Sequence, residues 1–193
     1  ATEVDKRLLD EAHRLQVIGR AGVCLDNVDI ATATSRGILV CNAPESNVVS
    51  AAEHSVALLL ALARNVAQAH SALTQGRWER SLWTGTELLN KTVGIVGLGR
   101  VGRLVAQRLK GFDVRILAFD PFVSSESARA VNAEMVELDD LLSQSDFVTV
   151  HLPRTPETVG LFDAERFTKF KPGARLVNAA RGGVVIEDDL LEA

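Results

Sequence analysis

The sequence has few cysteines, few histidines and no long apolar run, and each scarcity argues against a class of protein. Its two cysteines, Cys24 and Cys41, form neither a C-x-x-C pair nor a metal-ligand pattern, as is typical of proteins of the reducing cytoplasm. The four histidines lack H-x-x-x-H or H-E-x-x-H spacing, so we expect no metal site. The longest apolar stretch, residues 56–63, is far too short to cross a bilayer, and no charged-then-apolar leader indicates secretion.

The chain also lacks an excess of basic charge and the usual motifs of nucleophilic catalysis. With a formal net charge of -4, it gives no electrostatic reason to expect nucleic acid or an anionic membrane as a partner. No G-x-S-x-G motif is present, and neither cysteine has an evident base partner. Residues 85–92, GTELLNKT, nearly match a phosphate-binding P-loop, but Asn90 replaces the second glycine and the segment precedes a predicted strand. We therefore predict a turn there.

A length of 193 residues suits one full domain and part of another. Near its start, residues 4–14 are expected to form a helix, and apolar strands are expected at residues 15–22 and 38–44. Strand, helix and strand at this spacing indicate a βαβ unit of an α/β layer. Because the chain begins without an initiator methionine and stops at what resembles the opening of a helix, we expect it to be part of a longer protein.

The clearest helix signal starts at Ser50. Glu53 lies three residues later, which is the capping-box pattern, and apolar residues then recur at helical spacing up to Ala63. We predict about 20 helical residues without a break, as in a helix that links two domains. Residues 74–92 are irregular. Because Trp78 in that segment has no periodic core face to join, we predict that it contacts a second subunit; the alternative is packing within its own loop.

From residue 92 onward, short apolar strands alternate with helices. Strands are predicted at residues 92–97, 114–120, 147–153 and 174–180, and helices at residues 100–110, 138–144 and 163–170. Continuous Val, Ile and Leu runs are typical of parallel strands that are covered on both faces. The predicted fold class is therefore α/β, with a Rossmann-type doubly wound parallel sheet that follows part of a second α/β domain.

The loop after the first of these strands has the spacing G-x-G-x-x-G. Gly97 would permit the tight turn, Gly99 would let the backbone approach a pyrophosphate at the helix start, and Gly102 would pack the helix against the strand. Asp120 ends the next strand, where a carboxylate can accept hydrogen bonds from both hydroxyls of a ribose. Because an Asp there would repel a 2′-phosphate, the motif predicts NAD and not NADP; the alternative is a tight turn beside a solvated Asp.

Two more residues stand at strand ends, on the side of the sheet where open α/β folds bind ligands. Arg181 follows an apolar strand, with two alanines before it and two glycines after it. A guanidinium in this setting can fork to a carboxylate, although it could instead cap a strand-end carbonyl. His151 is either part of the site lining or a simple rim residue.

Five segments together resemble one family: GRAGVCLDNVD, NAPESNVVSAAEH, GTELLNKTVGIVGLGRVG, SDFVTVHLPRTPET and KPGARLVNAARGG. Nearly from end to end, the chain is similar to the D-isomer-specific 2-hydroxyacid dehydrogenases. The resemblance implies an NAD-dependent oxidoreductase in which residues 1–45 are part of the substrate-binding domain and residues 46–193 are the Rossmann domain without its C-terminal part. The most similar members oxidise 3-phospho-D-glycerate to 3-phosphohydroxypyruvate, the first step of L-serine biosynthesis. The alternatives are a glyoxylate/hydroxypyruvate reductase and an NAD-sensing corepressor of the same fold.

The resemblance also implies which residues form the site. Arg181 is implied as the catalytic arginine and, with Val23 and Cys24, as a contact of the 2-hydroxy or 2-keto acid. The implied NAD contacts are Val23, Gly97, Gly99, Arg100, Val101, Gly102, Asp120, Leu152, Pro153, Ala179, Ala180 and Arg181. The family's catalytic Glu and His would lie beyond Ala193, so we expect the 193 residues alone to be inactive. A cytoplasmic homodimer or homotetramer is expected.

The sequence departs from the family pattern at two positions. Cys24 stands where the family usually has glycine, so its backbone would be strained if that position needed a positive φ. Ile186 stands where the family favours Asp, a good helix N-cap, and losing such a cap costs about 1 kcal/mol.

Overall fold

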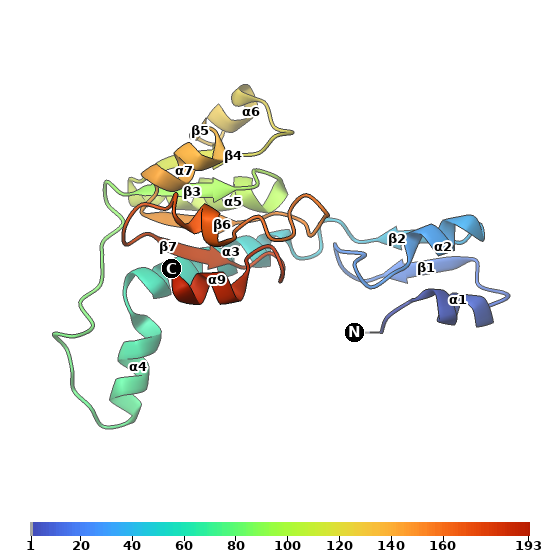
Figure 1. Cartoon of the computed structure of the whole chain (residues 1–193), viewed down its shortest axis with the longest axis horizontal. Coiled ribbons are helices and arrows are strands. Elements are labelled where there is room, and N and C mark those ends of the chain that lie inside the picture. The colour runs from blue at the N-terminus through green and yellow to red at the C-terminus, as the bar shows by residue number, and fades with distance from the viewer. Residues whose placement is uncertain (1) are drawn as a thin grey trace. The chain divides into compact units, whose positions relative to one another are not determined.

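The computed structural model describes residues 2–193, and the chain divides into two compact units, Ala1–Val48 and Val49–Ala193 (Figure 1). The first unit contains the segment that we predict to belong to a substrate-binding domain. The second contains the Gly-rich loop and the segment around Arg181. Each unit has its own buried apolar residues and is described by itself.

The first unit is a small βαβ arrangement preceded by a helix. Its elements are α1 (Lys6–Glu11), β1 (Val17–Arg20), α2 (Ile30–Ser35) and β2 (Leu39–Asn42), and β1 pairs with β2 in parallel. The predicted βαβ unit is confirmed. The first helix is shorter than the predicted residues 4–14, because Asp5 caps it by accepting from the Leu8 amide (2.9 Å) and Val4 forms a bridge with Val28.

The second unit begins with a helix that differs from the prediction at both ends. The helix α3 (Val48–Ala63) starts before Ser50, so the predicted capping box is wrong: Glu53 lies within the helix and its carboxylate pairs with Arg108 (3.0 Å). The predicted unbroken helix is also wrong. Asn65 adopts a left-handed conformation (φ 52°, ψ 35°), which an α-helix cannot continue through, and α4 (Val66–Thr74) follows at a bend of 66°.

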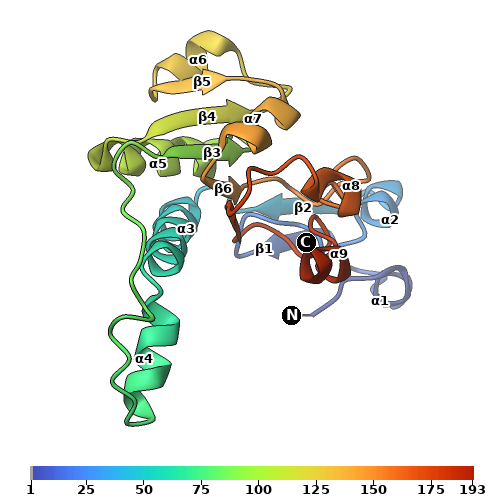
Figure 2. The same cartoon turned by 60° about the vertical axis from the view of Figure 1, so that its left-hand side comes forward.

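The helix α4 and residues 75–84, here called the arm, extend away from the rest of the second unit, and residues 85–91 return to it, with Leu88 in its buried core (Figures 1 and 2). The returning segment contains no helix or strand, as its sequence predicts. Among residues 2–193, no single helix has the length and apolar character to cross a membrane; α3 and α4 pass that test only as a bent pair.

Five parallel strands form the sheet of the second unit, in the order β5-β4-β3-β6-β7. The strands are β3 (Thr92–Val96), β4 (Arg115–Phe119), β5 (Ala133–Met135), β6 (Phe147–Val150) and β7 (Arg175–Asn178). The connecting helices are α5 (Arg100–Leu109), the 3-10 helix η1 (Lys110–Phe112), α6 (Ser125–Arg129), α7 (Leu138–Gln144), α8 (Ala164–Phe167) and α9 (Glu187–Glu192). The strand order turns back between β3 and β6, which is the place where open α/β sheets bind ligands.

Buried side chains cover both faces of this sheet, in two separate clusters. On one face, α3 and α5 contribute Leu59 and Val105 to a cluster that includes Ile95 of β3. On the other face, α7 contributes Leu141 and Leu142 to a second cluster. The predicted Rossmann-type, doubly wound α/β fold is thereby confirmed.

Candidate functional site

The Gly-rich loop joins β3 to α5 in a turn that needs glycine at two positions. Gly97 has φ +96°, and a Cβ added there would lie 2.8 Å from the carbonyl oxygen of His151. Gly102 lies on α5, where an added Cβ would lie 2.1 Å from the carbonyl oxygen of Gly97. Any side chain at either position would therefore push α5 or the β6 end away from the loop.

Gly99 differs from these two glycines because it faces open space. It is the N-cap residue of α5, its φ of -72° suits any residue, and no heavy atom lies within 4 Å of an added Cβ. The first backbone amides of a helix have no carbonyl acceptor within the helix and attract an anion. The open side of Gly99 therefore leaves room for a pyrophosphate next to Arg100 and Val101, the first two residues of α5.

Asp120 follows the last residue of β4, and two backbone amides hold its carboxylate. Oδ2 accepts a hydrogen bond from the Leu98 amide (2.9 Å), and Oδ1 accepts one from the Phe122 amide (2.9 Å). The carboxylate is thereby fixed against the Gly-rich loop. Since each carboxylate oxygen can accept more than one hydrogen bond, both oxygens retain capacity for ribose hydroxyls. This arrangement fits NAD.

The end of β6 contributes His151, Leu152 and Pro153 at the same edge of the sheet. The His151 amide donates to the Val96 carbonyl (2.8 Å), and the ring atom Nε2 lies 3.0 Å from Oγ1 of Thr149. Burial lowers the pKa of His151 to about 4, so its ring is uncharged at neutral pH. The carbonyl oxygen of His151 lies beside Gly97, 2.8 Å from the position of an added Cβ.

Arg181 lies in a turn that directly follows β7. Asn178, the last residue of β7, makes two hydrogen bonds to this turn: Oδ1 accepts from the Ala180 amide (3.1 Å), and Nδ2 donates to the Arg181 carbonyl (2.9 Å). The Arg181 guanidinium donates to the Ala180 carbonyl through Nη1 (2.6 Å). The sequence predicts Ala180 and Arg181 at this strand end but not the role of Asn178, because an Asn between an apolar strand and two alanines carries no specific signal.

Residues 182–186 are also anchored, in this case by the segment that precedes α8. The Gly160 amide donates to the Gly183 carbonyl (2.8 Å), and the Ile186 amide donates to the Phe162 carbonyl (2.9 Å). Ile186 is the N-cap residue of α9 and makes no side-chain cap hydrogen bond, as its apolar side chain predicts. Asp189 of that helix instead accepts from the Ala164 amide (2.8 Å) at the start of α8.

Val23 and Cys24 lie in the first unit, in the loop after β1. This loop is tied to the end of β2, because Asn42 Nδ2 donates to the Val23 carbonyl (2.6 Å) and the Ala43 amide donates to the Gly22 carbonyl (3.0 Å). Among residues 2–193, the non-glycine residues with positive φ are all elsewhere, so the strain considered for Cys24 is not present. The thiol of Cys24 is half-buried and free.

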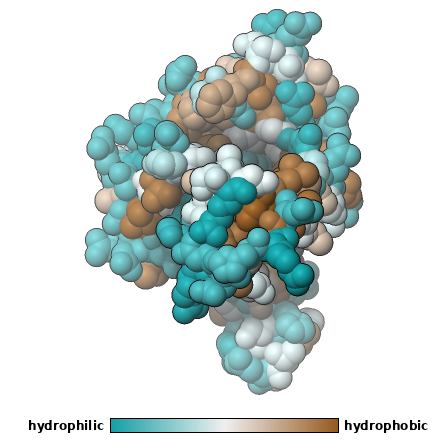
Figure 3. Space-filling view, turned by 90° about the vertical axis from the view of Figure 1, so that its right-hand side faces the viewer, coloured by the Kyte–Doolittle hydropathy of each residue, from teal (hydrophilic) through white to brown (hydrophobic). Residues whose placement is uncertain are grey.

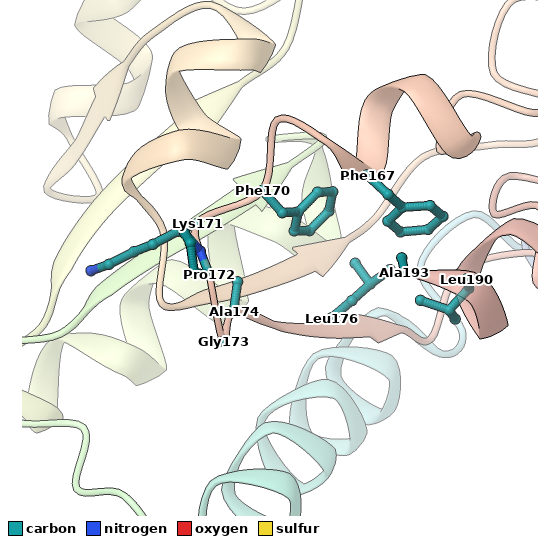
Figure 4. A pocket seen from close by; sticks show the side chains of 9 residues that line it. All are labelled: Phe167, Phe170, Lys171, Pro172, Gly173, Ala174, Leu176, Leu190 and Ala193. Atoms are coloured by element: carbon teal, nitrogen blue, oxygen red, sulfur yellow. The ribbon is translucent and has the colours of Figure 1, made fainter.

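The described residues form no metal-binding cluster, and a pocket lies away from this edge of the sheet. Residues 2–193 contain no group of three or more His, Cys, Asp or Glu side chains that could hold a metal ion. A pocket of about 230 Å³ lies beside α8 and α9, with the rings of Phe167 and Phe170 along it (Figure 4). Its lining includes none of the predicted site residues.

Comparisons with known proteins agree with this geometry. The family model for the D-isomer specific 2-hydroxyacid dehydrogenase, NAD binding domain, matches residues 56–193. D-3-phosphoglycerate dehydrogenase of Mycobacterium tuberculosis is 53% identical over 193 residues, which is 100% of this chain and 37% of that protein. The protein of the same name from Archaeoglobus fulgidus is 51% identical over 192 residues, covering 100% of this chain and 36% of that protein. The chain thus spans little more than a third of the length of these relatives.

Solved structures with NAD bound have the same fold. NAD-dependent formate dehydrogenase from Staphylococcus aureus, in complex with NAD, has a TM-score of 0.90 at 39% identity, covering 99% of this chain and 57% of that one. D-lactate dehydrogenase from Aquifex aeolicus, complexed with NAD and lactic acid, has a TM-score of 0.90 at 31% identity, with the same coverage of 99% and 57%. The chain belongs to the D-isomer specific 2-hydroxyacid dehydrogenase family, and its second unit carries the family's NAD-binding domain.

Proposed function

We propose that the protein oxidises a D-2-hydroxy acid with NAD, and that its preferred substrate is 3-phospho-D-glycerate, which yields 3-phosphohydroxypyruvate. One observation carries the proposal: the Gly-rich loop, Asp120 and the Arg181 turn all follow the carboxyl ends of strands of one parallel sheet. That edge is where such sheets bind ligands. The relatives named D-3-phosphoglycerate dehydrogenase support the choice of substrate.

In the second unit, one group of residues is proposed to bind NAD. Asp120 binds the adenosine ribose, and the amides at Gly99 and the start of α5 bind the pyrophosphate. Leu152 and Pro153 line the adenine side. When bound, NAD supplies the hydride acceptor.

The remaining residues face the reacting groups. Arg181 binds the substrate carboxylate and polarises the oxygen that becomes the keto group, because a guanidinium can donate two parallel hydrogen bonds. Ala179 and Ala180 leave room for the nicotinamide. Val23 and Cys24 are proposed to contact the substrate from the first unit.

The experiment that tests the proposal measures turnover in the full-length protein with NAD and a panel of acids. We expect the highest kcat/KM with 3-phospho-D-glycerate and lower values with D-glycerate, D-lactate and formate. Higher values with D-glycerate would favour the hydroxypyruvate reductase reaction. Binding of NADH without turnover of any acid would contradict the proposal and favour an NAD-sensing corepressor.

The preference for NAD is tested at Asp120. Asp120→Asn keeps the size and one acceptor for the Leu98 amide but removes the negative charge, so we expect weaker NADH binding, by roughly 10-fold, and tighter NADPH binding. Asp120→Ala also removes the contact with the Leu98 amide (2.9 Å), so it should weaken the binding of both cofactors. Fluorescence titration of the unmodified 193-residue chain and the two variants with NADH and NADPH measures all six affinities. Equal affinity of the unmodified protein for NADH and NADPH would sink the assignment.

We also propose that the protein is a homodimer or homotetramer of the cytoplasm. Large apolar side chains exposed on the arm, Leu73, Trp78 and Leu82, support self-association. Both cysteines are free thiols, which suits a reducing compartment.

A further inference from the structure

We propose that Asn178 is a positioning residue: its carboxamide holds the backbone of residues 179–181 in the turn that presents Arg181. The inference rests on the proposed role of Arg181 in binding the substrate carboxylate. Asn178 itself contacts the backbone of the turn and is not proposed to contact the substrate.

The two hydrogen bonds of Asn178 engage both sides of the turn. Oδ1 accepts from the Ala180 amide (3.1 Å), and Nδ2 donates to the Arg181 carbonyl (2.9 Å). One planar carboxamide therefore fixes a donor and an acceptor that lie one residue apart. Asp at this position would lack the donor, Ser is too short to make both bonds, and Gln is one methylene longer.

Most side chains of residues 179–183 are too small to hydrogen-bond the backbone, so the Asn178 carboxamide acts as a clamp that adds to the contacts that Ala180 and Arg181 make themselves. Ala179 and Ala180 have only methyl groups, Gly182 has none, and Gly183 adopts φ +80°. Strand β7 anchors the turn on one side. On the other side, the Gly183 carbonyl accepts from the Gly160 amide (2.8 Å). The Asn178 carboxamide acts between these two anchors.

The clamp reaches the guanidinium through one more contact. Nη1 of Arg181 donates to the Ala180 carbonyl (2.6 Å), and the Ala180 amide is the group that Asn178 Oδ1 holds. The Ala180 amide and carbonyl belong to the successive peptides 179–180 and 180–181, which meet at the Cα of Ala180, so a rotation of the first would shift the carbonyl that the guanidinium contacts. Displacing a catalytic group by about 1 Å can cost roughly 100-fold in rate, so a clamp on this peptide has a measurable effect.

The test is a double-mutant cycle in the full-length protein with Asn178→Ala, Arg181→Ala and the double variant. We expect Asn178→Ala to lower kcat/KM for the hydroxy acid by roughly 10- to 100-fold, while NADH affinity changes less than about fivefold. In the Arg181→Ala background the same substitution should change kcat/KM less than about threefold, because the guanidinium through which Asn178 acts is gone. If the double variant instead loses the product of the two single-variant losses in kcat/KM, the residues act independently and the proposal is overturned.

A second measurement tests the clamp without reference to catalysis. Hydrogen exchange of the peptide that contains the Ala180 amide should quicken in Asn178→Ala and, to a smaller extent, in Asn178→Ser, which can accept from that amide but cannot also donate to the Arg181 carbonyl. Unchanged exchange in both variants would overturn the proposal. If exchange quickens but Arg181→Ala retains full activity, the proposed function fails while the clamp stands.

The matched control is Gln144→Ala. Gln144 also makes two hydrogen bonds through an exposed carboxamide, accepting from Arg115 Nη1 (3.1 Å) and donating to the Asp140 carbonyl (3.1 Å). Because Arg115 begins β4 and Asn178 ends β7, the two carboxamides lie at opposite ends of the parallel strands. The control should change neither kcat/KM nor exchange at Ala180. If kcat/KM falls equally in Gln144→Ala and in Asn178→Ala, the effect is a general one of losing a carboxamide, and the specific role of Asn178 is overturned.

Discussion

His151 lies at the end of β6, where burial determines its charge. The ring contacts the hydroxyl of Thr149, a residue with no exposed surface, and burial lowers the pKa of His151 to about 4. A base with so low a pKa is a weak proton acceptor at neutral pH. His151 is therefore a poor choice for the acid–base residue of the proposed reaction.

The lowered pKa predicts how stability depends on pH. Between pH 6.5 and about 4 the unfolded chain binds a proton at His151 and the folded chain does not, so the free energy of unfolding falls as pH falls through this window. His151→Gln should remove up to about 3 kcal/mol of this dependence. Urea denaturation at pH 7.5 and pH 4.5 can be followed by the fluorescence of Trp78 and Trp83, both in the second unit.

The control for this experiment is His54→Gln, at an exposed position of α3. It shows what losing a histidine does without removing the buried ring. If the free energy of unfolding changes by the same amount between pH 7.5 and pH 4.5 in the unmodified chain and in His151→Gln, this pH dependence does not come from His151.

At the scale of elements, substitutions at glycines of α5 and its N-cap can distinguish an effect on stability from an effect on NADH binding. Gly102→Ala should lower the free energy of unfolding by about 2 kcal/mol, because the new Cβ would lie 2.1 Å from the Gly97 carbonyl oxygen. Gly99→Ala meets no atom within 4 Å, so stability should change by less than about 1 kcal/mol while NADH affinity falls. Urea denaturation and NADH titration measure the two effects.

Gly111→Ala, in η1, is the matched control. It also meets no atom within 4 Å and is remote in sequence from the loop, so it should change neither quantity appreciably. A destabilised Gly99→Ala would contradict the open space at Gly99, and a Gly99→Ala that binds NADH normally would show that this space does not receive the pyrophosphate.

The elements that could be predicted from sequence are those with strong local patterns. The strands around Ile95 and Val148 are continuous apolar runs, and the spacing of Gly97, Gly99 and Gly102 is set within a few residues. The strand β5 and the helix α6 were not predicted, because Ala133–Met135 and Ser125–Arg129 are too short for a periodic signal.

Other features could not be predicted because they depend on contacts between residues far apart in the sequence or on the shape of a turn. The predicted capping box was wrong because α3 already starts at Val48, and Glu53 instead pairs with Arg108, 55 residues away in the chain. The break after α3 depends on a left-handed Asn65, and its side chain donates to the Thr84 carbonyl (3.3 Å) across the arm. The contacts of Asn178 depend on the shape of the following turn, so its place in the site emerged only from the structure.

At the scale of the whole molecule, the arm carries several large apolar side chains that are exposed. Trp78 is 80% exposed and Leu82 is 67% exposed, and Leu73 on α4 is more than half exposed. On the face drawn in Figure 3, groups of apolar residues are bordered by hydrophilic ones. Because the buried cores of the second unit include neither Trp78 nor Leu82, these side chains need another surface to leave water.

We predict that Trp78 contacts a second copy of the chain. Trp78→Ala should weaken self-association by about 2 kcal/mol, or roughly 30-fold in the Kd, because large aromatics at such contacts commonly supply much of the binding energy. Sedimentation velocity over a range of concentrations measures the change. Phe122→Ala is the matched control: Phe122 is an aromatic residue with 95% exposure that lies outside the arm, between β4 and α6, and should leave the distribution of species unchanged. If Trp78→Ala sediments like the unmodified protein, Trp78 packs within its own loop instead, and self-association has to come from another surface.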